Sequence, residues 1–133
     1  MTTKEISGGM APRPAGHGTS ISSLDSLGNL LLTADQKDTV LAWDVRSMGS
    51  TAPLLKYSVL GVHKIMLVSS RVAVATTSQG LVLLHLESGQ VTPVPKFSDG
   101  RPTDVYNDMR WNRDKSILFA AGGDGKLDLY SLS

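Results

Sequence analysis

The chain of 133 residues contains no cysteine, so disulfide bonds and thiolate metal sites are both excluded. It also lacks an excess of either charge, because 13 Lys and Arg residues face 12 Asp and Glu residues and leave a net charge of +1. Without a strong field of one sign, nucleic acid and anionic membranes are disfavoured as partners. Apolar runs such as residues 30–32 are short, and none approaches the roughly 18 residues of a membrane-spanning helix.

The amino-terminal segment lacks the apolar stretch of an export signal, since no run of apolar residues follows Lys4. Residues 1–15 are rich in Gly, Pro, Ser and Thr and predict a flexible arm. Together with the absence of cysteine, this composition predicts an intracellular protein, cytoplasmic or nuclear.

A sustained helical period is missing as well. From residue 20 onward, short runs of β-branched and aliphatic residues recur every eight to twelve positions, separated by Gly, Asp, Asn or Ser. The pattern predicts an all-β protein. The expected strands cover residues 20–27, 29–34, 39–45, 53–60, 63–70, 71–77, 80–86, 90–96, 104–111, 116–122 and 126–132.

The expected strands fall into repeating sets. The segments TVLAWDV, LVLLHLE and KLDLYSL begin at residues 39, 81 and 126, at intervals of 42 and 45 residues. Four-stranded repeats of roughly 40 to 45 residues are typical of β-propeller blades, because one such sheet must stack on its neighbours to bury both faces. Pro53, Pro93 and Pro95 occur in the fourth runs, where an outer edge strand tolerates proline. We therefore expect three blades in one unit over 16–133, at about 16–60, 61–98 and 99–133, with the third lacking its outer strand.

The sequence resembles the WD-repeat β-propeller family. Its repeat opens with Gly-His and closes with Trp-Asp, as Gly16-His17 and Trp43-Asp44 do here, and residues 109–125 align with the family pattern without a gap. Asp124-Gly125 then falls on the turn between the second and third strands, where Asp-Gly also favours a hairpin.

In this family a buried network links the Gly-His histidine, a Ser or Thr of the second strand, a turn Asp and the tryptophan of the third strand. The resemblance assigns these roles to His17, Thr33 and Trp43 in the first blade, where Lys37 takes the place of the Asp and Asp38 follows one position late. It assigns Gln79 and His85 to the second blade, and Asp124 and Tyr130 to the third. Arg101-Pro102 replaces Gly-His there, so the network is expected to be incomplete and packing between the sheets to be mainly apolar.

No residue pattern points to catalysis or to a cofactor. His17, His63 and His85 are spread over two blades without carboxylates at ligand spacing, so no metal site is expected. The segment GGDG at 122–125 lacks the Lys-Ser/Thr and the strand-to-helix context of a phosphate loop. Serines do not occur in a nucleophile-elbow pattern. An enzyme is therefore disfavoured, although a propeller enzyme stays an alternative.

Two sets of residues are candidates for protein binding. Residues 43–46 read WDVR and resemble the motif by which some propellers dock on the adaptor of cullin-ring ubiquitin ligases, with Arg46 projecting; the alternative is a solvated turn arginine. Mixed charge is expected on the rim formed by the turns between strands, and such a rim suits a protein partner better than a polyanion. The candidates on this rim are Lys37, Lys64, Asp99, Arg101 and Asp104.

Three blades cannot close a ring, since closed propellers have four to eight. The end blades are expected to expose apolar faces, with Leu31, Val40, Leu118 and Leu127 among their residues. Two copies could form a pseudo-sixfold ring, another polypeptide could supply blades, or the chain could belong to a longer propeller. Residues 3–10 could also pair with the last strand of a neighbouring copy, as amino-terminal strands do in many propellers.

The resemblance implies a non-enzymatic scaffold that assembles with another chain or copy and presents loops to proteins. No cofactor, nucleic acid or membrane insertion is expected. A phosphoinositide-binding propeller is disfavoured because Arg71 and Arg110 stand singly.

Overall fold

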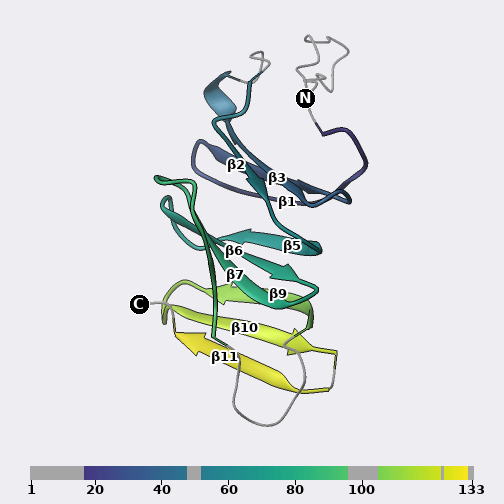
Figure 1. Ribbon diagram of the computed structural model, residues 1–133. Helices are drawn as coiled ribbons and strands as arrows, with labels where there is room; N and C mark the ends of the chain where they lie inside the picture. The colour runs from purple at the N-terminus through teal and green to yellow at the C-terminus, as the bar shows by residue number, and fades with distance from the viewer. Residues whose placement is uncertain (1–16, 48–51, 96–104, 124, 132–133) are drawn as a thin grey trace, which may run out of the picture.

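The computed structural model describes residues 17–47, 52–95, 105–123 and 125–131, and apart from one short 3₁₀ helix their regular elements are all β-strands. The strands form three antiparallel sheets, which stack from blade one at the top of Figure 1 to blade three at the bottom. This arrangement confirms the predicted all-β fold with three propeller-like blades. None of the described segments contains a helix with the length and apolar character needed to span a bilayer.

Each blade is a meander in which neighbouring strands pair in chain order. Short turns make this possible, as at Gly28, whose φ of 59° favours glycine between the first two strands. Blade one comprises β1 (Ile21–Leu27), β2 (Leu30–Asp35), β3 (Thr39–Asp44), η1 (Val45–Ser47) and β4 (Leu55–Ser58). Blade two comprises β5 (Val62–Leu67), β6 (Val72–Thr77), β7 (Gly80–His85) and β8 (Val91–Pro93). Blade three comprises β9 (Tyr106–Asn112), β10 (Ile117–Gly122) and β11 (Leu127–Ser131).

The edges of the sheets agree with the expected blade geometry. Pro93 ends β8, which pairs with β7 alone among the described strands, so its missing N–H breaks no ladder there. Blade three has three strands in the described part of the chain, and β11 is its outer edge. The third blade therefore lacks an outer strand within the described residues, as predicted. The blade boundaries remain predictions, and the expected arm over 1–15 lies outside the described residues.

A β-bulge repeats near the start of the first strand of every blade. The register with the second strand skips Ser22 in β1, His63 in β5 and Asn107 in β9. A bulge adds one unpaired residue and increases the local twist of the strand. Because the bulge recurs at the same place in each sheet, the three blades have equivalent backbone structures although their sequences differ.

Two apolar cores lie between the blades. The first fills the space between blades one and two, and its buried residues include Leu32, Ala34, Ile65 and Leu84. The second joins blades two and three around Val74, Leu81, Tyr106 and Leu118. Blade two therefore buries both faces, because it is the only sheet of the three with a described neighbour on each side.

Direct hydrogen bonds supplement these cores. The hydroxyl of Ser23 and the carboxylate of Asp25, both on β1, accept bonds from the backbone N–H groups of Ile65 and Leu67 at 3.2 and 2.7 Å. These N–H groups lie on the edge of β5 that no strand covers in the described structure. Side chains of one blade thus satisfy the strand edge of the next.

The prediction of the exposed faces is partly wrong. Val40 and Leu118 are 0% and 1% exposed, because both point into the cores between blades. Leu127, by contrast, is 61% exposed and Leu129 is 51% exposed. Both pair across the ladder with residues of β10 that alternate with the buried Leu118, so they lie on the face turned away from blade two. We call this face, with Phe119, Ala121, Leu127 and Leu129, the blade-three flank.

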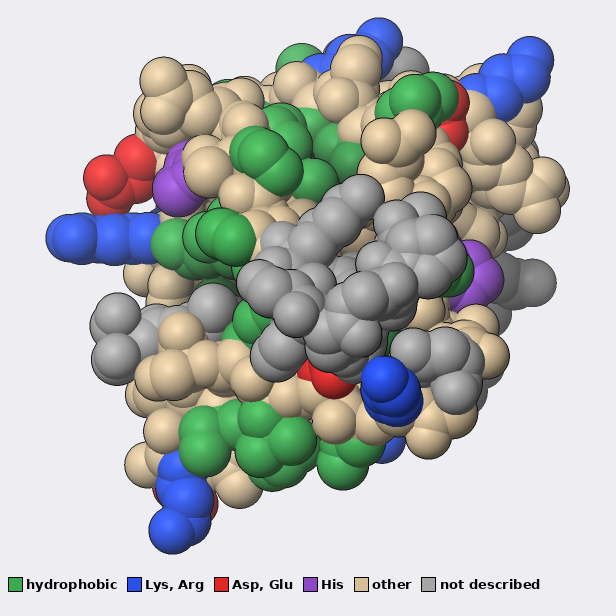
Figure 2. All heavy atoms as spheres, turned by 60° about the horizontal axis from the view of Figure 1, so that its bottom comes forward, with side chains coloured by type: hydrophobic (Ala, Val, Ile, Leu, Met, Phe, Trp, Pro, Cys, Tyr) green, Lys and Arg blue, Asp and Glu red, His purple; other side chains and the backbone are tan. Residues whose placement is uncertain are grey.

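Figure 2 is turned so that the blade-three end of the molecule comes toward the viewer. Hydrophobic side chains gather at several places on this side. A shallow hollow of about 180 Å³ lies on the flank, lined by Phe119, Ala121 and Leu127 together with residues 108–110 of β9. An apolar face of this kind is typical of an interaction surface.

Candidate functional site

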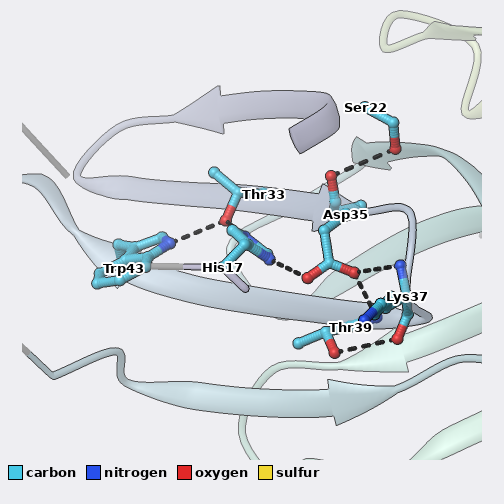
Figure 3. Close-up of polar contacts among 8 residues, drawn as sticks. His17, Ser22, Thr33, Asp35, Lys37, Thr39 and Trp43 are labelled. Atoms are coloured by element: carbon cyan, nitrogen blue, oxygen red, sulfur yellow. Dashed lines mark hydrogen bonds and ion pairs between the residues drawn. The ribbon is translucent and has the colours of Figure 1, made fainter. Parts of the chain in front are cut away.

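A network of four polar side chains lies on the face of blade one that points away from blade two (Figure 3). His17 Nδ1 is 2.8 Å from Asp35 Oδ2, and His17 Nε2 is 2.5 Å from Thr33 Oγ1. Trp43 Nε1 donates a hydrogen bond of 2.9 Å to the same Thr33 oxygen. With a neutral imidazole, Nδ1–H donates to the carboxylate and Nε2 accepts the hydroxyl proton, so every group has a partner.

The structure therefore brings together three residues that the sequence singled out and adds a fourth, Asp35. The expectation that Lys37 and Asp38 leave this network without its acid is wrong, because the carboxylate comes from the last residue of β2 and not from the turn. Asp38 serves elsewhere, since its carboxylate accepts a bond of 2.8 Å from the N–H of Gly61.

Asp35 also closes the turn between β2 and β3. Its Oδ1 accepts hydrogen bonds from the backbone N–H groups of Lys37 and Thr39 at 2.8 and 3.1 Å (Figure 3). Burial by itself raises the pKa of this carboxyl, but the hydrogen bonds from His17, Lys37 and Thr39 outweigh it, so the pKa lies below its ordinary value. The carboxylate is thus held in its charged form.

Blade two has no comparable network in the described structure. Thr77 occupies the position of Asp35, and its hydroxyl accepts a bond of 3.0 Å from Gln79 N–H. The assignment of His85 to the tryptophan position is wrong. Leu84 takes that position and packs in the core shared with blade one, whereas His85 points to the opposite face of its sheet and bonds Thr92. The turn after Thr77 is shorter than its counterpart in blade one, which shifts the equivalence by one residue.

Blade three builds a different buried group. The hydroxyl of Tyr106 donates to Asp128 Oδ2 at 2.6 Å and also bonds the hydroxyl of Tyr130. The rings of Tyr106 and Tyr130 meet edge to face with centroids 6.2 Å apart. The buried acid is Asp128 on β11, which sequence reasoning missed, and the expected Asp124 lies outside the described residues.

Three of the protein-binding candidates can be placed. Lys37 is exposed in the turn between β2 and β3. Lys64 lies within β5, not in a loop, and its ammonium group pairs with Asp108 of blade three at 2.9 Å. Arg46 is exposed in η1 and forms a bidentate pair with Asp44, with Nε and Nη2 at 3.0 and 2.8 Å from the carboxylate oxygens. The remaining candidates, Asp99, Arg101 and Asp104, lie outside the described residues.

The pairing at the WDVR segment has an electrostatic consequence. The hydrogen bonds from the Arg46 guanidinium, and then from its backbone N–H, lower the pKa of Asp44 to about 2. The arginine side chain is therefore tied back to its own turn while it remains accessible on the surface.

The first strands of the three blades line one groove, which we call the axial groove. It has a volume of about 590 Å³, and its walls are residues 22–26 of β1, 64–67 of β5, 108–111 of β9, and Arg113. The Lys64–Asp108 ion pair bridges two of these strands. The hydrogen bonds from Lys64 and from Met109 N–H lower the pKa of Asp108. Across the described residues, no three His, Asp or Glu side chains come together as a metal site.

The sequence matches no family model and no curated protein. Solved structures do match the fold. The β-propeller domain of Cps50 (Swd1) from Myceliophteria thermophila gives a TM-score of 0.78 at 18% identity, over 94% of this chain and 42% of that chain. The C-terminal WD40 domain of Sif2 gives 0.73 at 15% identity, over 96% and 36%. The computationally designed Ika8 protein gives 0.71 at 16% identity, over 95% and 37%.

The chain therefore has a WD-repeat propeller-like fold, in agreement with the resemblance found in its sequence. It spans about two fifths of the length of these three chains. At such identities the likeness concerns the fold alone.

Proposed function

We propose that this chain is a non-enzymatic scaffold for protein interactions, a propeller segment whose open end is completed by another protein surface. The observation that carries the proposal is the blade-three flank, where the side chains of Leu127 and Leu129 are 61% and 51% exposed. Covering one leucine side chain contributes about 1.5–3 kcal/mol.

Three arrangements would cover this flank. A separate polypeptide could supply the missing blades, two copies could associate, or further blades could follow in a longer chain. The asymmetry between the ends favours a different surface over an identical one. On blade one, Thr33, Leu41 and Trp43 are already buried, so the two ends do not present matching apolar faces. A hetero-complex or split propeller is therefore our preferred arrangement.

The rim of the blades would then present loops to partners. Lys37 in the β2–β3 turn belongs to this rim, and Asp99, Arg101 and Asp104 are proposed to extend it. Charges of both signs suit the polar rim of a protein interface.

The test compares two double variants of the tagged chain by crosslinking and quantitative co-isolation. Leu127→Ser/Leu129→Ser should lose the partners that the unmodified chain retains. Leu54→Ser/Leu60→Ser removes two leucines that are 59% and 69% exposed outside the flank, and it should retain them. Equal retention by both variants would contradict the proposal.

Docking on the adaptor of cullin-ring ligases through Arg46 stays an alternative prediction. The guanidinium is accessible, but a partner would have to share it with Asp44. Direct binding of the purified adaptor, lost in Arg46→Ala, would support this alternative.

A further inference from the structure

A second cavity lies between blades two and three, apart from the blade-three flank. Its volume is about 500 Å³, within the range typical of small-ligand pockets. Blade two contributes apolar side chains from the end of β5, the start of β6 and from β7, while blade three contributes Trp111 and polar residues. The lining residues are Val68, Ser69, Val72, Leu83, Trp111, Arg113, Ser116 and Ser131.

The pocket has one cationic residue, Arg113, and no acidic residue in its lining. The Arg113 guanidinium donates a bond of 3.3 Å to the carbonyl oxygen of Val68, which ties it across the two blades. Among the described residues no carboxylate lies within ion-pair distance of it. A guanidinium carries five N–H donors, so most of them remain available to a ligand.

Trp111 supplies a second, independent observation. Its indole Nε1 is buried and has no hydrogen-bond partner in the described structure. Buried donors of this kind are rare in folded proteins, and each one calls for an explanation. Trp111 also lines the pocket together with Arg113, so a ligand seated there would contact the side chain that carries this donor.

We propose that this pocket binds a carboxylate carried by an apolar group, namely the carboxy-terminal residue of a partner polypeptide with an aliphatic side chain. In such a residue the carboxylate and the side chain branch from the same Cα atom. One residue can therefore present its carboxylate to Arg113 and its side chain to the apolar wall of Val68, Val72 and Leu83 in the same pocket.

A single arginine suits this ligand better than a phosphate. Carboxylate carries one negative charge and accepts two parallel N–H bonds from one guanidinium. A phosphate near pH 7 carries up to two charges, and the lining offers no second Lys or Arg to share them. The hydroxyls of Ser69, Ser116 and Ser131 would add neutral donors.

The site goes beyond the proposed scaffold role, because its residues are separate from Leu127 and Leu129. The experiment is an NMR titration of the ¹⁵N-labelled full chain, in which the indole signals of Trp43 and Trp111 are followed separately and assigned with Trp111→Phe. The probe is the acetylated peptide Gly-Ser-Ala-Val-Leu with a free carboxy terminus. Its amidated form and the free acid 4-methylpentanoic acid are the comparison ligands.

We expect a saturable shift of the Trp111 indole signal with the acid peptide and an unmoved Trp43 signal. Amidation of the peptide, or Arg113→Gln in the protein, should weaken binding tenfold or more. The affinity of Arg113→Lys for the acid peptide should lie between those of the unmodified chain and Arg113→Gln. Arg110→Gln, which changes an arginine outside the pocket, should leave the affinity within twofold. Leu127→Ser/Leu129→Ser should also leave the peptide affinity within twofold, because both leucines lie outside the pocket. The pocket proposal can therefore be tested whether or not the flank binds a partner.

Equal binding of acid and amide, or equal effects of Arg113→Gln and Arg110→Gln, would overturn the proposal. Binding of 4-methylpentanoic acid without binding of the peptide would overturn the polypeptide as the occupant. Unchanged indole signals of Trp43 in every variant serve as the check that the fold is retained.

Discussion

The carboxylate of Asp25 in blade one accepts a hydrogen bond of 2.7 Å from the backbone N–H of Leu67 in blade two. This bond crosses between two sheets that meet mainly through apolar side chains, as does the neighbouring bond from Ile65 N–H to Ser23. It shows how a side chain of one blade can satisfy the edge of β5, which no described strand covers.

Removal of this acceptor should loosen the junction between blades one and two. Asp25→Ala leaves the N–H of Leu67 without its partner, and we expect a loss of about 1–2 kcal/mol in the free energy of unfolding. Urea unfolding measures the difference. The control is Asp114→Ala, which deletes an exposed carboxylate in the turn after β9 and should change stability by less than about 0.5 kcal/mol. Equal effects would contradict the role of Asp25.

Thr33 is the centre of the blade-one network, because its single hydroxyl bonds both His17 and Trp43. Thr33→Val keeps the shape of the side chain but leaves a buried imidazole nitrogen and a buried indole N–H without partners. We expect Thr33→Val to lower the free energy of unfolding by about 2–3 kcal/mol. Thr92→Val is a matched control, since Thr92 also bonds a histidine ring but does so at the surface. That control should cost less than about 0.5 kcal/mol, and a comparable loss in both variants would count against a special role for the buried network.

Asp35 should make stability depend on pH in acid. Its pKa in the folded chain lies below its ordinary value of 3.8, so the unfolded chain binds its proton more readily. The stabilisation is therefore complete above the unfolded pKa and is lost as the pH falls through the folded pKa. Asp35→Asn should flatten the decline in urea midpoint between about pH 5 and pH 2, although Asp44 and Asp108 keep part of the slope. An unchanged slope, with Asp114→Asn as reference, would refute this assignment.

Gly61 connects blades one and two in a conformation that excludes a side chain. Its φ is +69°, and an added Cβ atom would lie 2.1 Å from Ser78 Oγ and 2.8 Å from Ser78 Cβ. Gly61→Ala should therefore cost about 3 kcal/mol or more, from the strained backbone and the clash together. Gly28 has a φ of +59° with nothing within 4 Å, so Gly28→Ala should cost only about 1 kcal/mol. Equal costs in thermal or urea unfolding would show that the contact with Ser78 relaxes freely.

Much of the fold could be predicted because alternating apolar residues mark each strand and turn residues separate them. The interval between TVLAWDV and KLDLYSL reflects real structural equivalence. Trp43 pairs with Leu31 of β2, and Tyr130 pairs with Leu118 at the corresponding place of β10. The alignment of the intermediate segment LVLLHLE with TVLAWDV is wrong by one residue, because it places His85 instead of Leu84 at the position of Trp43. Two residues separate β6 from β7, whereas three separate β2 from β3, and a shift of one residue in a strand exchanges its two faces.

The acidic residues of the networks were harder to predict, for a different reason. Asp35 lies at the end of a strand instead of in the turn, and only the register of β2 places its carboxylate beside His17. Asp128 reads as the polar residue of an alternating strand, yet it is buried next to Tyr106 from β9, which lies 22 positions away in the sequence. Contacts of this kind depend on how strands pair across a sheet, and local patterns do not contain that information.

The central claim is that the blade-three flank must be covered by another protein surface. Light scattering coupled to size-exclusion chromatography on the purified chain tests it most directly. We predict that the unmodified chain does not run as a folded, monodisperse species of 14.2 kDa, and that Leu127→Ser/Leu129→Ser does. A folded unmodified chain that stays at 14.2 kDa over a wide range of concentrations would contradict the account.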